Sequence, residues 1–130
     1  MEETIFTKII YGDIPSHKIY EDDKTFAFLD THPAQPGDVL VVPKKPIQFL
    51  WDLPDEDYLA LMATVKKVAR RQREILGVPY VGVKVVGVDV PHAHVHLIPF
   101  HTAAEFNQVA DTTAEPDNSA LAAVAARLAF

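Results

Sequence analysis

Three histidines stand at alternate positions in the segment Pro91-His92-Ala93-His94-Val95-His96-Leu97-Ile98-Pro99, which holds half of the six histidines of the chain. Side chains alternate between the two faces of a β-strand, so His92, His94 and His96 are expected to share one face. Successive rings on that face would stand about 6.6 Å apart, at about 3.3 Å per residue. This spacing is too long for two rings to act on one atom, but both can flank one phosphate group. One imidazole can then attack phosphorus while its neighbour serves the leaving group.

Two alternative roles for the three histidines stay open. They could fill a half-buried face of a sheet, but each buried imidazole would then need a hydrogen-bond partner of its own. They could also bind a metal ion, although the chain has no cysteine and its other candidate ligands are scattered. The alternation therefore favours chemistry on a phosphate group over a purely structural role.

The histidine segment resembles the His-φ-His-φ-His-φ-φ signature of the histidine-triad (HIT) family, in which φ is an apolar residue. The likeness is to the Hint-like nucleotide-binding branch, and it extends from about Ile5 to Pro99. The amino-terminal half is similar in order and spacing through the segments Thr4-Ile5-Phe6-Thr7-Lys8-Ile9-Ile10, Ile14-Pro15, Tyr20-Glu21-Asp22-Asp23, Ala27-Phe28-Leu29-Asp30 and Val41-Val42-Pro43-Lys44-Lys45. Residues 101–130 would then form a variable carboxy-terminal tail.

The resemblance implies a role for each histidine. His94 would be the nucleophile that takes the nucleotidyl group from the α-phosphate, and a neutral imidazole is competent for this near its reference pKa of about 6.5. His96 would bind a phosphate oxygen or assist the leaving group, and His92 would support the nucleophile from behind. Water would then release the nucleoside monophosphate. Asp30 matches the acidic residue that accepts hydrogen bonds from the ribose hydroxyls in the family.

The resemblance also implies a nucleotide-binding set. The apolar residues that would enclose the base are Ile5, Phe6, Ile9 and Phe28, which by themselves would be taken for core residues. The set is completed by Asp30, Thr31, Asp89 and Val90. The resemblance implies a purine nucleotide, but an apolar slot of this kind recognises the ring of a base more than its edge, so the residues themselves do not specify the base.

Two departures from the family concern metal and charge. Many members bind a structural zinc ion with two cysteines near the start, a histidine before the third strand and the first histidine of the triad. This chain has Thr4, Thr7 and Asp38 at the first three positions, so we expect no metal there. We expect Asp38 to pair with His92 instead.

The second departure is in the turn before the triad, where the family often has Gly-Gln-Ser or similar donors to phosphate. This chain has a shorter turn with Gly87-Val88-Asp89. A carboxylate about 4 Å from phosphate would cost about 1 to 4 kcal/mol in a wet, surface-like dielectric. Asp89 is therefore expected to turn away, to offer its backbone N–H, or to mark a different substrate. Lys84 could offset the charge, although a solvated strand lysine is the simpler interpretation.

Five strands and two main helices are expected to position these residues. Strands are predicted at residues 18–20, 25–29, 39–42, 80–86 and 93–100. Residues 55–76 have helical apolar spacing, three acidic residues in the first turn and Gly77 at the end. Residues 4–11 favour a turn or short helix, residues 102–116 look irregular, and Ser119 could cap a short carboxy-terminal helix. The expected class is α+β, a HIT-like fold with a five-stranded antiparallel sheet, one long helix and a short carboxy-terminal helix.

Composition limits the class of protein further. The 130 residues suit a single domain, taken as residues 1–130. With 12 basic and 18 acidic residues the net charge is −6, which argues against nucleic acid as a partner. No apolar stretch reaches the ~20 residues that cross a bilayer, and the amino terminus lacks the pattern of a signal peptide. A cytoplasmic location, a homodimer and the absence of any cofactor are the corresponding expectations.

The sequence thus predicts a nucleotide-binding hydrolase that cleaves the α-phosphate bond of a purine nucleoside phosphoramidate, an adenylate or a dinucleoside polyphosphate through a nucleotidyl-histidine intermediate. Two alternatives belong to other classes of protein. One is a module that binds nucleotide with little or no turnover, which the altered turn at Gly87 to Asp89 would permit. The other is a histidine-rich metal-binding protein.

Overall fold

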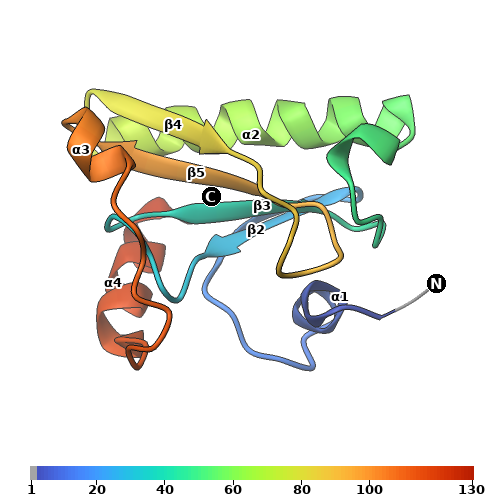
Figure 1. The fold of residues 1–130 in the computed structure, drawn as a ribbon, viewed down its shortest axis with the longest axis horizontal. Coiled ribbons are helices and arrows are strands. Elements are labelled where there is room, and N and C mark those ends of the chain that lie inside the picture. The colour runs from blue at the N-terminus through green and yellow to red at the C-terminus, as the bar shows by residue number, and fades with distance from the viewer. Residues whose placement is uncertain (1–2) are drawn as a thin grey trace.

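A computed structural model describes residues 3–130, in which the helices lie around a single sheet (Figure 1). The strands are β1 (Lys18–Glu21), β2 (Thr25–Leu29), β3 (Val39–Pro43), β4 (Tyr80–Lys84) and β5 (Val95–Phe100). The helices are α1 (Ile5–Ile10), α2 (Asp55–Leu76), α3 (Ala103–Phe106) and α4 (Asn118–Leu128), with a short 3-10 turn at Leu50–Asp52. No helix within residues 3–130 has the length and apolarity needed to cross a membrane.

The five strands form one antiparallel sheet in the order β1-β2-β3-β5-β4. The α+β class and the five-stranded antiparallel sheet are therefore confirmed. The order places β5, which carries the end of the histidine segment, between β3 and β4. Strand β4 lies at one edge of the sheet, and no other strand of the described chain pairs with its outer side.

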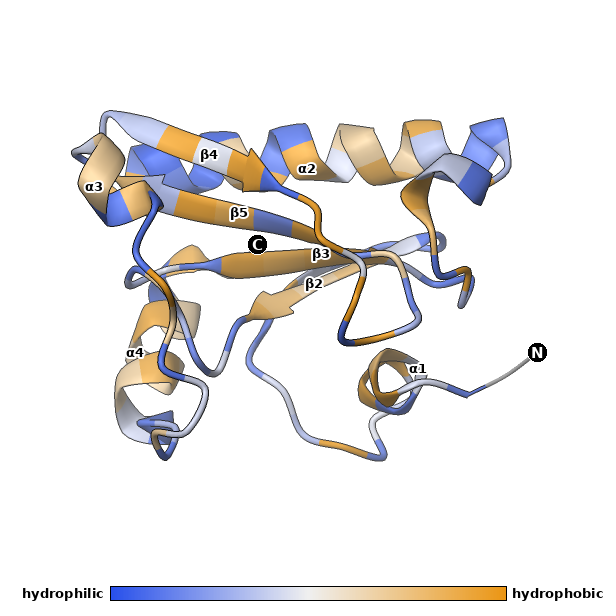
Figure 2. Ribbon diagram, viewed as in Figure 1, coloured by the Kyte–Doolittle hydropathy of each residue, from blue (hydrophilic) through white to orange (hydrophobic). Residues whose placement is uncertain are grey.

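The sheet is covered on both faces, because β2 and β3 are buried along their whole length. One face packs against α2, and the buried residues of this main cluster include Leu29, Val41, Leu61, Val68 and Leu97. The other face packs against α1 through a smaller cluster made by Phe6, Phe26, Phe28, Leu40 and Val42. Figure 2 shows the resulting pattern, with apolar central strands and an α2 that carries both polar and apolar residues.

Helix α2 has the bounds that the sequence predicts. Its first turn carries Asp55, Glu56 and Asp57, which complement the positive end of the helix dipole. Gly77 ends it in the left-handed conformation with a φ of 66°, which a residue with a side chain rarely adopts. The expected carboxy-terminal helix is also present, although Asp117 rather than Ser119 accepts the capping hydrogen bond, from the N–H of Ala120.

Strands β1 and β3 each end one residue later than expected, and three larger expectations about the elements were wrong. Strand β5 begins at Val95 rather than at residue 93, because the N–H of Ala93 donates to the carbonyl of Ile47 at 2.7 Å instead of to a neighbouring strand. Strand β4 ends at Lys84 rather than at residue 86. Helix α3 forms in a segment that was expected to be irregular, and a capping box between Thr102 and Glu105 begins it.

Candidate active site

His94 lies just before β5 and is 6% exposed. Its Nδ1 is 2.8 Å from the main-chain carbonyl oxygen of His92. Because a carbonyl oxygen can only accept a hydrogen bond, Nδ1 carries the proton in the neutral ring. The other nitrogen, Nε2, therefore keeps its lone pair, which is the form of imidazole that can attack an electrophile.

His96 is the second residue of β5, and its ring centroid is 5.1 Å from that of His94. The rings are closer than the 6.6 Å expected from a regular strand, at about 3.3 Å per residue, because His94 precedes the strand. Burial lowers the pKa of His96 to about 4, and the electrostatic interactions of His96 with His94 and Lys84 act in the same direction. His96 is therefore neutral near pH 7 and offers a hydrogen bond rather than a full charge.

His92 is fully buried and makes two hydrogen bonds through its ring. Its Nε2 donates to the carbonyl oxygen of Pro43 at 2.7 Å, and its Nδ1 accepts from the hydroxyl of Thr4 at 2.8 Å. Burial is the main cause that lowers its pKa. The side chain of His92 thus anchors α1 to β3, and it is the backbone carbonyl of His92 that orients the ring of His94.

The expected pairing of Asp38 with His92 was wrong. Asp38 directly precedes β3, whereas His92 binds Pro43 at the far end of that strand. One carboxylate oxygen of Asp38 instead accepts hydrogen bonds from the N–H groups of Ala34 and Gln35, at 2.7 and 3.4 Å. The other oxygen, Oδ1, is buried without a hydrogen-bond partner among residues 3–130, and burial raises the pKa of Asp38 to about 7.

A cavity of about 560 Å³ opens beside His94 and His96, and we refer to it as the site cavity. This volume is within the range typical of small-molecule sites. Of the residues predicted for nucleotide binding, those that line it are Phe6, Asp30, Asp89 and Val90. The cavity therefore brings both acting histidines together with four of the eight predicted nucleotide-binding residues.

The other four predicted residues lie outside the lining of the site cavity. Phe28 and Ile9 belong to the apolar cluster behind Phe6, so they support its wall without facing the open space. Ile5 is 49% exposed on α1. Thr31 lines a separate hollow beside Leu121 of α4.

Asp30 directly follows β2 and lines the site cavity, and one of its carboxylate oxygens is engaged in a hydrogen bond. Oδ1 accepts a hydrogen bond from the N–H of His32 at 2.9 Å. Oδ2 is 4.0 Å from Nδ1 of His96, too far for a direct hydrogen bond. Burial raises the pKa of Asp30. Because His96 is neutral near pH 7, the two groups do not form an ion pair there.

Three features of the site cavity differ from what the sequence predicts. Lys84 lines the cavity, although a solvated strand lysine was the simpler interpretation, and Asp38 lines it as well. Residues 107–110 and Thr112, from the segment after α3, also line it. For Lys84 a signal was present, since β4 runs antiparallel to the histidine strand, but the segment after α3 has no pattern that would indicate contact with the site.

Comparisons with known proteins agree on one domain type. A sequence model of the HIT domain matches residues 11–103. The adenosine 5'-monophosphoramidase HNT1 of Saccharomyces cerevisiae is 38% identical over 96 residues, which are 73% of this chain and 61% of that protein. The crystal structure of a Hit-like protein from Bartonella henselae superposes with a TM-score of 0.84 at 28% identity, covering 97% of this chain and 94% of the other.

A third comparison bears on the metal. A Zn-bound histidine triad family protein from Mycobacterium smegmatis superposes with a TM-score of 0.73 at 31% identity, covering 95% of this chain and 94% of the other. In this chain both ring nitrogens of His92 are engaged, one of them by Thr4, whose hydroxyl also accepts the N–H of Thr7. Neutral hydroxyls are poor zinc ligands, and the donor set therefore does not fit the ion. Hydrogen bonds between Thr4, His92 and Pro43 hold this corner together.

Proposed function

This chain belongs to the HIT family, and from that premise we propose that it is a nucleotide hydrolase that acts through a nucleotidyl-histidine intermediate on His94. The observation that carries the proposal is the hydrogen bond from Nδ1 of His94 to the carbonyl of His92, which leaves Nε2 as a nucleophile beside the site cavity. The substrate is a purine nucleoside phosphoramidate, an adenylate or a dinucleoside polyphosphate.

The reaction proceeds in two displacements at the α-phosphorus. Nε2 of His94 forms a bond to phosphorus while the bond to the leaving group breaks, and the leaving group departs with the electron pair. Water then attacks the same phosphorus, the bond to Nε2 breaks, and the pair returns to His94. The products are the nucleoside monophosphate, which keeps the hydroxyl of the water, and the leaving group. The second proton of the water goes to the leaving group when this is an amine, and to solvent when it departs as a phosphate anion. His96 donates a hydrogen bond to a phosphoryl oxygen or to the leaving atom.

The remaining lining residues support nucleotide binding. The free oxygen of Asp30 can accept hydrogen bonds from the ribose hydroxyls. Phe6 and Val90 offer an apolar wall for the base, backed by Phe28. Asp89 is exposed at the rim, where it can turn toward solvent.

Turnover of an adenosine phosphoramidate tests the proposed function. We expect His94→Ala to lose at least about a thousandfold in kcat, the order of magnitude for removal of a covalent nucleophile. His101→Ala is the matched control, because His101 is exposed and does not line the site cavity. Equal turnover by His94→Ala and wild type would refute the mechanism.

A nucleotide-binding module with little turnover is the second candidate. The turn at Gly87-Val88-Asp89 favours it, because this turn brings a carboxylate instead of neutral donors to the rim. Retained binding of AMP with no hydrolysis by the wild type would select this candidate over the enzyme.

A homodimer belongs to the same proposal and is supported by the outer edge of β4. Near this edge, large apolar side chains are exposed: Tyr80 at 56%, Val83 at 53%, Val85 at 40% and Val86 at 57%. An uncovered apolar edge strand invites pairing with another strand. A second copy of β4 in antiparallel pairing would cover it and extend the sheet.

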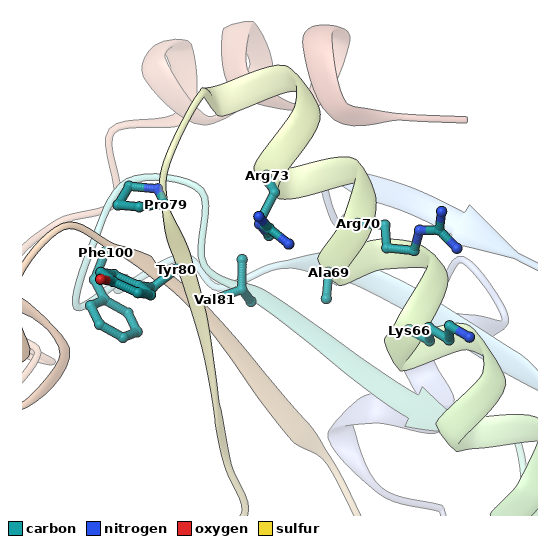
Figure 3. A pocket seen from close by; sticks show the side chains of 8 residues that line it. All are labelled: Lys66, Ala69, Arg70, Arg73, Pro79, Tyr80, Val81 and Phe100. Atoms are coloured by element: carbon teal, nitrogen blue, oxygen red, sulfur yellow. The ribbon is translucent and has the colours of Figure 1, made fainter.

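The groove between α2 and β4 supports the same arrangement (Figure 3). Its apolar part includes Ala69 and Val81, and the cations of Arg70 and Arg73 stand at the carboxy-terminal half of α2. The opposite end of α2 carries an acidic first turn. Two copies of the helix that lie antiparallel would therefore match opposite charges.

Light scattering tests the homodimer. We expect a dimeric wild type and a monomeric Val83→Lys, since a lysine on an edge strand opposes pairing. Tyr11→Lys is the control, because Tyr11 is 71% exposed and directly follows α1, on the other side of the molecule from β4. A monomeric wild type would contradict the dimer but not the chemistry. The cytoplasmic location stays a prediction from the sequence.

A further inference from the structure

Lys84 is the last residue of β4, and its Cα partner in the antiparallel register is His96. Residues that stand opposite each other in such a pair project from the same face of the sheet. Both side chains accordingly line the site cavity. The positive charge of Lys84 is therefore on the same face of the sheet as His96 and borders the same cavity.

An aromatic ring holds the ammonium group in this place. Nζ of Lys84 is 5.2 Å from the ring centroid of Phe106, a cation–π contact. Phe106 is the last residue of α3 and lies directly over Gly82, where a Cβ atom would collide with the ring. The glycine in β4 thus allows the close approach of α3, and α3 in turn supplies the surface on which Lys84 rests.

Within residues 3–130 no carboxylate forms a salt bridge with Lys84. This matters because the site cavity contains the carboxyl groups of Asp30, Asp38 and Asp89. An ammonium group that is held in an acidic cavity without a paired carboxylate is available to an anionic ligand. A lysine that served only to balance these acids would be expected to contact one of them.

The segment after α3 adds a neutral hydrogen-bond donor to the lining of the same cavity. The amide Nε2 of Gln35 donates to the carbonyl of Glu105 at 3.0 Å and to Oε1 of Gln108 at 2.8 Å, which fixes the side chain of Gln108 by its oxygen. The amide nitrogen of Gln108 is then directed away from Gln35. Both Gln108 and Asn107 line the site cavity, and they lie beyond residue 103, where the family match ends.

We propose that Lys84, positioned by Phe106, binds the leaving group and selects substrates in which that group is a phosphate chain, that is, nucleoside polyphosphates. The proposal rests on the proposed function and deepens it. In the first displacement the bond between Nε2 of His94 and the α-phosphorus forms, and the bond from that phosphorus to the bridging oxygen breaks. The bridging oxygen keeps the electron pair, and the charge that it gains is offset by Lys84.

The protonation state of His96 in the site cavity favours an anionic leaving group. A phosphate has a second pKa of about 6 and departs as an anion without taking a proton. An alkylamine, with a pKa of about 10, must be protonated as it departs. His96 is neutral near pH 7, so it does not hold the extra proton that a departing amine would need. The site cavity is thus better suited to stabilise a departing anion than to protonate a departing amine.

The test compares two substrates on Lys84→Met: a diadenosine polyphosphate and an adenosine phosphoramidate with a neutral amine leaving group. We expect kcat/KM for the polyphosphate to fall about 10- to 100-fold, the loss of one charge-assisted hydrogen bond, and kcat/KM for the phosphoramidate to change less than about threefold. Phe106→Leu should lower the polyphosphate value about threefold. Lys18→Met is the control, because Lys18 lies on β1, where it pairs with Glu21.

Equal losses on both substrates, or no loss on either, would overturn the proposal. Direct binding of inorganic pyrophosphate separates this failure from failure of the proposed function, because it needs no chemistry at His94. We expect Lys84→Met to weaken pyrophosphate binding about tenfold. Unchanged pyrophosphate binding would reject the role of Lys84 whether or not the enzyme turns over. Loss of pyrophosphate binding in a protein without turnover would reject the hydrolase alone.

Discussion

Asp38 should make the stability of the protein depend on pH in a way that one substitution can isolate. Its side chain is buried, with a residue exposure of 3%, and one carboxylate oxygen accepts two backbone N–H groups while the other has no partner among residues 3–130. In the variant Asp38→Asn the amide oxygen can still accept these hydrogen bonds, but the side chain cannot ionise. The difference in free energy of unfolding between wild type and variant therefore reports the ionisation of Asp38.

The magnitude follows from the raised pKa. Burial raises the pKa of Asp38 from 3.8 to about 7, so near pH 5 the carboxyl is protonated in the folded state and ionised in the unfolded state. The folded state then binds more protons, and stability falls as pH rises from about 4 to about 7. A shift of about 3 units at about 1.36 kcal/mol per unit corresponds to about 4 kcal/mol.

Urea unfolding at about pH 4.5 and about pH 8.5 measures this difference for both proteins. We expect Asp38→Asn to gain several kcal/mol relative to wild type at the higher pH, and to gain little at the lower pH. Asp23→Asn, at an exposed aspartate, controls for the removal of one negative charge. A difference between wild type and Asp38→Asn that stays constant with pH would show that Asp38 is ionised in the folded state across the range.

Three further predictions concern the anchor of α1 and the rim of the site cavity. Thr4→Val removes the cap of α1 and leaves Nδ1 of His92 without its hydrogen-bond partner. The free energy of unfolding, measured in urea, should therefore fall by about 2 to 3 kcal/mol. An unchanged urea midpoint would contradict the hydrogen bonds described. A chelator should not shift the melting temperature, and a shift would reveal a structural metal. Asp89→Ser should tighten binding of AMP about fivefold by calorimetry, the equivalent of about 1 kcal/mol, and weaker binding would refute the repulsion argument.

Local patterns in the sequence were sufficient to predict the strands of the sheet and the long helix. The bounds of α2 follow from its acidic first turn and from Gly77, which act on the residues next to them. The predicted carboxy-terminal helix is also present as α4, and its Leu121 and Leu128 pack on the main core. These features depend on the residues of the element itself, so a pattern within a few turns of chain is enough to predict them.

Contacts between distant segments were not predictable in this way. Helix α3 is docked because Gly82 leaves room for Phe106, a contact between two distant segments that no local pattern indicates. The predicted contact between Asp38 and His92 was wrong because the two residues lie at opposite ends of β3. Likeness to a family aligns positions along the chain but does not show at which end of a strand each side chain lies. Lys84 was visible as a strand lysine, but its place in the site cavity, on the ring of Phe106, depends on the packing around it.

The central claim is that His94 becomes covalently bound to a nucleotidyl group, and rapid quenching of wild-type protein with substrate, followed by intact-mass measurement and peptide mapping, tests it most directly. We predict an added mass of one nucleoside monophosphoryl group on the peptide that contains His94, and none in His94→Ala. Turnover of the substrate with no adduct on any histidine, or with the adduct on His96, would contradict the account.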